Sequence, residues 1–211
     1  GAGFQLASHD LDMRGGGNLL GDQQSGHVRE VGVELYQSML EDAVKALQSG
    51  QAGDPDVADE WSPQINLGVA VLIPDTYVED LGVRLGLYRR LADATSEQAR
   101  ESFAAELIDR FGPLPEATSQ LLEVTSIKAQ CRHLGISKLD AGPKGVVMTF
   151  RNDTPIDPAA LMQLVRARPG RMRLRPDSKL VITGMPAEGA ARLTAIRGLL
   201  RELDAASPVS G

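Results

Sequence analysis

The fold class is decided by the stretch Ile65-Asn-Leu-Gly-Val-Ala-Val-Leu-Ile73, in which apolar residues occupy every second position. Alternation with a period of two predicts a strand with one buried face. Pro74 follows directly and ends the strand, because proline has no backbone N–H to donate. The fold class then depends on what separates this strand from the later strands of the chain.

Three helical patterns lie between this strand and the next one. Capping-box spacing at Thr76–Glu79 and again at Thr95–Gln98 predicts the starts of two helices. A third helix is predicted from about Glu116 to Leu134, and Gly135 is placed to end it.

The remaining chain mixes short strands with helices. Strands are predicted at Val146–Phe150, Met172–Leu174 and Leu180–Thr183, and Asp157-Pro158 is a typical helix start. A last helix carries apolar residues at Leu193, Ile196, Leu199, Leu200 and Leu203. Because the helical block stands between the first strand and the others, the sequence favours an α+β fold with a small sheet and several helices.

The chain divides into two parts joined by a linker. Apolar residues recur at helical spacing over residues 28–47, and residues 49–64 are rich in Ser, Gly, Asp and Pro with little apolar content. We therefore expect a helical hairpin and loop motif over 1–48, a linker over 49–64 and a mixed α+β domain over 65–211.

Composition narrows the function classes. The 211 residues carry a net charge of −6, which argues against a domain that binds nucleic acid through bulk charge. Cys131 is the single cysteine, lies in a helical pattern and is expected to be buried. No apolar run is long enough for a membrane span and no signal peptide is evident, so a cytoplasmic location is expected.

A glycine-rich loop stands out near the amino terminus, in residues 14–27, with glycines at 15, 16, 17, 21 and 26. Glycine lets a backbone approach a partner closely and adopt positive φ. The loop is not a nucleotide cradle, because the Gly-x4-Gly-Lys-Ser/Thr string is absent from the whole chain. We therefore expect no ATP site and no catalytic residues in this chain. The sparse His and Cys residues likewise predict no metal site.

Several strings resemble the carboxy-terminal region of the bacterial transcription-repair coupling factors, the Mfd family. They are Gly1–Ala7, Asp10–Gly21 with Gln24-Ser-Gly26, Glu34–Val44, Ile73–Tyr77, Arg84-Leu85 with Tyr88–Ala92, and Glu106–Pro115. The resemblance runs along essentially the whole chain. The RecG helicases carry a looser version of the first strings, but residues 65–205 do not resemble their end.

The resemblance implies a motor function for the parent protein. Members of the family are ATP-dependent translocases of helicase superfamily 2 that act on duplex DNA, displace stalled RNA polymerase and recruit UvrA. Arg14 and Gln24 match residues that couple ATP hydrolysis to translocation, with Gly15, Gly17 and Ser25 beside them. ATP and Mg²⁺ would bind to the motor lobes of the parent, outside this chain.

Glu106, Asp109 and Arg110 fall on one helix face, at positions i, i+3 and i+4. They form either a solvated stripe with a local ion pair or a docking patch. The family resemblance implies the second: a terminal domain that packs on a UvrB-like module of the same chain and hides the surface that binds UvrA.

Two alternatives remain open. The basic run Arg166, Arg168, Arg171, Arg173 and Arg175 contacts phosphates or, as alternation over 171–175 favours, forms the solvated face of a half-buried strand. The second alternative concerns the whole chain, which could be a non-motor module that binds a protein partner and does not contact DNA. Such a module would have no use for the glycine-rich loop in residues 10–27.

Overall fold

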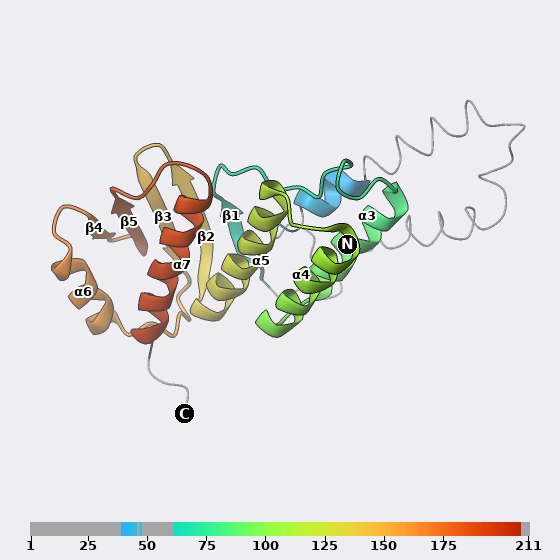
Figure 1. Ribbon diagram of the computed structural model, residues 1–211. Coiled ribbons are helices and arrows are strands. Elements are labelled where there is room, and N and C mark those ends of the chain that lie inside the picture. The colour runs from blue at the N-terminus through green and yellow to red at the C-terminus, as the bar shows by residue number, and fades with distance from the viewer. Residues whose placement is uncertain (1–38, 46, 48–60, 208–211) are drawn as a thin grey trace, which may run out of the picture.

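The structure, a computed structural model, describes residues 39–45, 47 and 61–207. Its elements in chain order are β1 (Gln64–Asn66), α3 (Leu81–Asp93), α4 (Glu97–Phe111), α5 (Glu116–Leu134), β2 (Ile136–Gly142), β3 (Gly145–Phe150), α6 (Pro158–Ala167), β4 (Met172–Arg175), β5 (Lys179–Thr183) and α7 (Gly189–Ala205). The strands form one mixed sheet with helices packed around it, which confirms the predicted α+β class (Figure 1).

The sheet has the strand order β1-β2-β3-β5-β4. β1 pairs with β2 in parallel, because the block α3–α4–α5 crosses over between them, and every other pairing is antiparallel. The crossover carries two helices, α3 and α4, that do not lie on the sheet. They form a hairpin on the far side of β1 (Figure 1).

One face of the sheet is covered by α5 and α7, which lie side by side (Figure 1). The strand residues beneath them are fully buried, among them Leu139, Met148 and Leu180. α6 packs against the edge strand β4. The side chains of the other face alternate with these along each strand and are mostly polar or charged, with Val147 and Val181 among them.

The stretch Ile65–Ile73 differs from its prediction. Only Gln64–Asn66 pairs as a strand, although Leu67, Val71 and Ile73 are buried in the predicted alternation. Gly68 adopts a φ of +66°, which leaves the extended region and ends the ladder. Beyond it, other partners take the backbone groups that a second strand would have used.

These partners are side chains and a helix terminus. Arg192 donates to the Leu67 carbonyl at 2.7 Å, and Thr118 Oγ1 donates to the Leu72 carbonyl at 2.9 Å. The Leu72 amide donates to the Ala117 carbonyl, and the Ile73 amide donates to the Tyr88 hydroxyl at 2.7 Å. These four backbone groups of the segment are therefore hydrogen-bonded although the segment is not a strand.

Two predicted helix starts are also displaced. α3 begins after Asp80, whose side chain accepts from the Val83 amide, so the predicted start at Thr76 is wrong and residues 75–77 form a turn. α4 begins after Ser96, one residue past Thr95. The predicted start at Asp157-Pro158 is confirmed, with Asp157 accepting from the Ala159 amide.

The end of α5 is confirmed at Gly135, which has a φ of +69°. A Cβ there would lie 2.7 Å from Thr154 Cα, so only glycine fits the close approach of the two segments. The strand β2 was not predicted, whereas β3, β4, β5 and α7 lie where the sequence predicts them. In β4, Met172 is buried and Arg173 and Arg175 are exposed, which confirms the half-buried strand.

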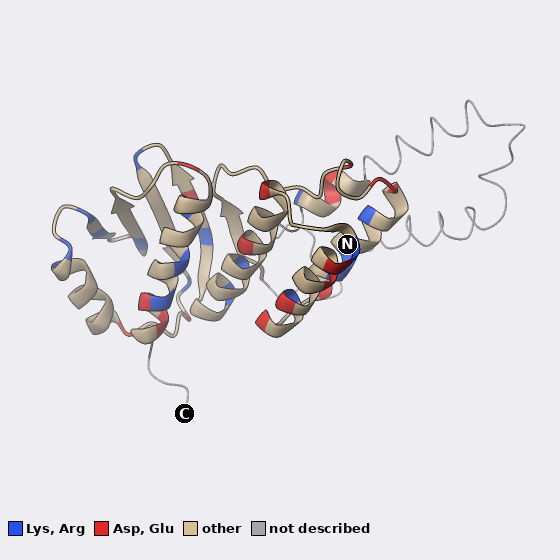
Figure 2. Ribbon diagram, in the orientation of Figure 1, with Lys and Arg blue, Asp and Glu red and all other residues tan. Residues whose placement is uncertain are grey.

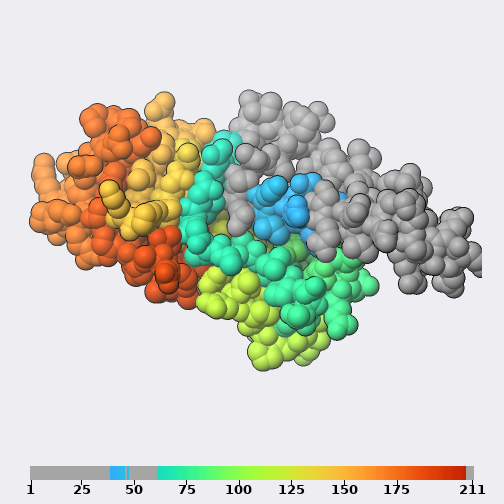
Figure 3. Space-filling model, turned by 90° about the horizontal axis from the view of Figure 1, so that it is seen from above, coloured from blue at the N-terminus to red at the C-terminus, as the bar shows by residue number. Residues whose placement is uncertain are grey.

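The predicted helix over 28–47 is described only for residues 39–45 and 47, which are helical. Met39, Leu40 and Leu47 are buried and belong to the common hydrophobic core. This segment, blue in Figure 3, lies beside the residues that follow β1. The predicted domain boundary falls mostly on residues outside the described ranges, and Gln64, its last linker residue, opens β1.

Three buried arginines bind the loops to the body of the domain. Arg84 donates to the carbonyls of Val78 and Glu79, and Arg100 donates to the carbonyl of Ala94. Arg192 donates to three carbonyls, those of Leu67, Gly142 and Pro186. A buried guanidinium with its N–H groups paired is stable, because each charge-assisted bond offsets part of the desolvation cost.

Candidate interdomain contact surface

The candidate surface lies on α4, in the α3–α4 hairpin. α4 buries Phe103 and Leu107 against its neighbours and turns the opposite side to solvent. The Tyr77 hydroxyl closes its last turn and lies 3.1 Å from the Leu107 carbonyl and 2.7 Å from the Gly112 carbonyl. The exposed side is thus presented by a helix whose C-terminal end is fixed by Tyr77.

The Glu106 carboxylate is held by two arginines. Arg90 of α3 binds it through two nitrogens, with Nη1 at 2.5 Å from Oε2 and Nη2 at 2.8 Å from Oε1. Arg110, one turn further along α4, donates to Oε2 at 3.1 Å. These bonds hold the pKa of the Glu106 carboxyl well below its ordinary value, at about 2, so it is ionised at every physiological pH.

Both arginines are also stacked on rings. The Arg90 guanidinium lies 5.6 Å from the centre of the Phe103 ring, and that of Arg110 lies 4.8 Å from the centre of the Phe111 ring. Stacking and ion pairing together restrict the rotamers of both side chains. The charges are therefore positioned before any partner arrives.

Asp109 and Ile108 complete the exposed side. Asp109 is exposed and, within the residues that the structure describes, enters no ion pair. Ile108 exposes 48% of its surface and adds an apolar side chain among these charges. Figure 2 shows acidic and basic residues intermixed along α4. We call Arg90, Glu106, Ile108, Asp109 and Arg110 the α4 surface.

The structure brings the predicted triad together and adds a residue that sequence reasoning missed. Glu106 and Arg110 form the local ion pair that the solvated-stripe alternative predicts, and the role of the three residues in docking stays a prediction. Arg90 was not predicted, because its role depends on how α3 packs on α4, and helical spacing within one helix carries no such information. The remaining predicted site residues, Arg14, Gly15, Gly17, Gln24 and Ser25, lie outside the described residues.

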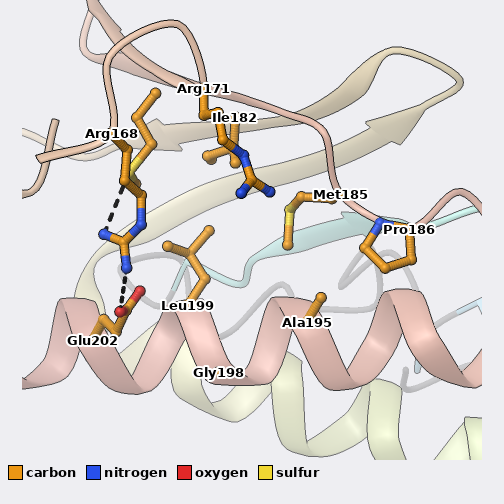
Figure 4. A pocket seen from close by; sticks show the side chains of 10 residues that line it. Arg168, Arg171, Ile182, Met185, Pro186, Ala195, Gly198, Leu199 and Glu202 are labelled. Atoms are coloured by element: carbon orange, nitrogen blue, oxygen red, sulfur yellow. Dashed lines mark hydrogen bonds and ion pairs between the residues drawn. The ribbon is translucent and has the colours of Figure 1, made fainter.

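Apart from the α4 surface, a hollow with a volume of about 360 Å³ lies between α7 and the strands β4 and β5 (Figure 4). Met172, Ile182 and Leu199 form its apolar lining, and an ion pair between Arg168 and Glu202 crosses one end. Glu202 is the one carboxylate among its lining residues, and Arg168 holds it in an ion pair. The hollow is a gap in the helical cover of the sheet.

Metal and thiol chemistry find no support in the described ranges. No group of three or more His, Cys, Asp or Glu side chains there is arranged to hold a metal ion. Cys131 is fully buried, and burial raises the pKa of its thiol to about 12. None of the described helices has the length and apolar character needed to cross a membrane.

Comparison with known proteins identifies the family of this chain. Residues 67–161 match the model of the TRCF domain. The chain is 39% identical over 206 residues, 97% of its length, to the transcription-repair-coupling factor of Escherichia coli K12. It is 42% identical over 182 residues to the factor of Rickettsia prowazekii.

The chain belongs to the transcription-repair-coupling factor family. The α4 surface falls inside the matched TRCF domain. A solved structure described as the C-terminal domain of a transcription-repair coupling factor shares the fold, with a TM-score of 0.59 at 18% identity over 69% of this chain and 96% of that one. The chain spans 18% of the length of the E. coli coupling factor and 16% of that from R. prowazekii.

Proposed function

We propose that this chain is the carboxy-terminal part of an ATP-dependent duplex DNA translocase that displaces stalled RNA polymerase and recruits nucleotide excision repair. The observation that carries the proposal is the similarity to coupling factors over 97% of the chain. In this part, residues 1–48 serve translocation and residues 65–211 regulate the recruitment of UvrA.

The regulatory role rests on the α4 surface. We propose that it docks on a UvrB-like module of the same protein and hides the surface that binds UvrA. Two features favour a reversible contact. The charges of Glu106, Asp109 and Arg110 are exposed, and exposed charges tune association rates and specificity more than affinity. Arg90 holds Glu106 in place, so docking requires little reordering.

A binding measurement tests this contact. Calorimetry of this chain with the isolated UvrB-like module should give a heat of binding that Asp109→Lys abolishes or weakens severalfold. Glu101→Lys is the matched control, because it makes the same charge change at another exposed position of α4. If the two variants bind equally well, the α4 surface is not the docking site.

The translocation role belongs to Arg14 and the glycines around it. We propose that Arg14 and Gln24, with Gly15, Gly17 and Ser25, relay the movement of the motor lobes to DNA. ATP and Mg²⁺ bind to those lobes, so this chain alone should not hydrolyse ATP with or without DNA. Turnover by this chain that depends on its own residues would contradict the assignment.

The coupling role has a separate test. In the full-length protein, Arg14→Ala should leave ATP hydrolysis largely intact while abolishing displacement of stalled polymerase. Gln24→Ala should act in the same direction. Loss of hydrolysis and displacement to the same extent would instead mean that Arg14 serves the fold or the ATP site.

The rival function is a non-motor module that only binds a protein partner. The exposed Ile108 suits either function, because an apolar residue amid charges is common in protein interfaces. Deletion of residues 10–27 separates the two. It should abolish translocation by the full-length protein if the first function holds, and it would leave partner binding and every activity unchanged for a pure interaction module.

A further inference from the structure

The face of the sheet that points away from α5 and α7 carries an ordered row of polar side chains. In register, Gln64 of β1 lies beside Lys138 of β2, and Lys138 lies beside Thr149 of β3. Thr149 is paired in turn with Lys179 of β5, and Lys179 with Arg175 of the edge strand β4. We call these five residues the basic row. It crosses all five strands, which in sheets lie about 4.8 Å apart.

The charge of this face is opposite in sign to that of the chain. Lys138, Lys179 and Arg175 keep 47%, 39% and 48% of their side chains exposed, in a chain with a net charge of −6. Arg173 adds a fourth cation from the next row, beside Val181. Only Asp140 and Asp177 oppose these cations on the strands and turn concerned.

Asp177 and Asp140 show that these cations can bind an anionic group. Asp177 lies 3.6 Å from Arg175 Nε and 3.7 Å from Lys179 Nζ, so both cations converge on one carboxylate. Asp140 lies 3.4 Å from Lys138 Nζ. Exposed ion pairs at such distances contribute little to stability, so another anion can displace the carboxylates at low cost.

We propose that the basic row binds the phosphate backbone of duplex nucleic acid. All five of its residues are of the types that contact phosphate oxygens: Arg, Lys, Thr and Gln. Residues on the same face of the five strands include no aromatic side chain, so the strands themselves offer no platform on which unpaired bases could stack. Backbone contact without base contact favours a duplex, bound without regard to sequence.

The expected binding is weak and strongly dependent on salt. Few cations take part and the rest of the chain is acidic, so the dissociation constant should fall in or above the nonspecific range of about 10⁻⁴ to 10⁻⁶ M. Each phosphate neutralised should contribute about 0.9 to the slope of log affinity against log salt concentration. Such a site matters where the rest of the protein already holds DNA nearby.

Fluorescence anisotropy of a labelled duplex, titrated with this 211-residue chain at rising NaCl concentrations, tests the proposal. Some variants should weaken binding and another should strengthen it. Lys179→Gln and Arg175→Gln should each weaken binding at low salt by roughly threefold or more and lower the slope by about 0.9. Asp177→Asn should strengthen binding, because it removes the competing carboxylate. Arg175 and Asp177 are exposed and Lys179 is half-buried, and unchanged thermal unfolding checks that each variant is folded.

Matched controls carry the same charge changes elsewhere. Arg201→Gln on α7, which covers the opposite face, and Glu101→Gln on α4 should leave affinity nearly unchanged. The proposal is overturned if the controls act as strongly as the row variants, or if the native chain does not bind at low salt. It is also overturned if Arg14→Ala abolishes binding that the row variants leave intact, or if polyglutamate competes as well as the duplex, which would indicate an acidic protein segment as the partner.

Discussion

At the scale of single residues, the Glu106 carboxylate fixes the charge pattern of the α4 surface. Its pKa is about 2 in the folded chain, because Arg90 and Arg110 hydrogen-bond the ionised form. A folded pKa below the unfolded one adds stability above the unfolded value of about 4.5, and this stability is lost as the pH falls toward 2. Docking through this surface should therefore not change between pH 8 and pH 5.

We expect thermal unfolding to report this titration. The difference in melting temperature between the native chain and Glu106→Gln should be constant above about pH 5 and should shrink as the pH falls from 4.5 toward 2. A carbon NMR titration of the Glu106 carboxyl gives the midpoint directly. A midpoint near 4.5 would mean that Arg90 and Arg110 do not hold the carboxylate in solution.

Cys131 provides a residue-scale probe of the core. Its thiol is fully buried in α5, and burial raises its pKa to about 12, while only the thiolate reacts. Ellman's reagent at pH 8 should leave the folded chain almost unmodified and react with one thiol per chain in guanidinium. Rapid reaction of the folded chain would contradict the packing of α5 against the sheet and α7.

At the scale of elements, two tyrosines fix the α3–α4 hairpin in opposite ways. The Tyr77 hydroxyl donates to carbonyls at the end of α4, whereas the Tyr88 hydroxyl accepts from the buried Ile73 amide. Tyr88→Phe leaves that amide without its acceptor and should cost about 1–3 kcal/mol. Tyr77→Phe frees carbonyls near solvent and should cost about 1 kcal/mol or less.

Urea denaturation of the two variants measures this difference, with hydrogen exchange as a local readout. Tyr77→Phe should speed exchange in the last turn of α4 only, and Tyr88→Phe should speed it at Ile73 as well as lower global stability. Both substitutions keep the ring and remove only the hydroxyl, so equal losses in the two variants would contradict the different roles assigned to the two hydroxyls.

Periodicity predicted burial better than it predicted hydrogen bonding. Residues 65–73 alternate between buried and exposed as expected, but Gly68 and the donors Arg192 and Thr118 prevent a second strand. Thr118 lies 46 residues from Leu72 and Arg192 lies 125 residues from Leu67, so no local pattern contains these partners. β2 was missed because its burial is irregular and its pairing with β3 shifts register between Ile136 and Lys138.

The candidate site, like the fold, was predicted from the sequence only in its local features. Helical spacing placed Glu106, Asp109 and Arg110 on one exposed side, and the structure confirms the ion pair within α4. The stronger ion pair, to Arg90, joins two helices and follows from the packing of the hairpin. Spacing along one helix thus identifies a charged side, while its rigidity depends on tertiary contacts.

At the scale of the whole molecule, the α4 surface and the basic row lie on different parts of the chain. The first is on the α3–α4 hairpin and the second is on the open face of the sheet. With both proposed contacts, the domain would hold a protein module and a duplex at once or exchange one for the other. The proposed contact of the α4 surface is the one that would link the domain to the recruitment of UvrA.

Capture of UvrA by the full-length protein tests that link most directly, with and without residues 65–211. We predict that removal of these residues increases the capture of UvrA, and that Asp109→Lys in the intact protein does the same while Glu101→Lys does not. Unchanged or weaker capture after removal would contradict the masking role and would leave the α4 surface to a partner outside the chain.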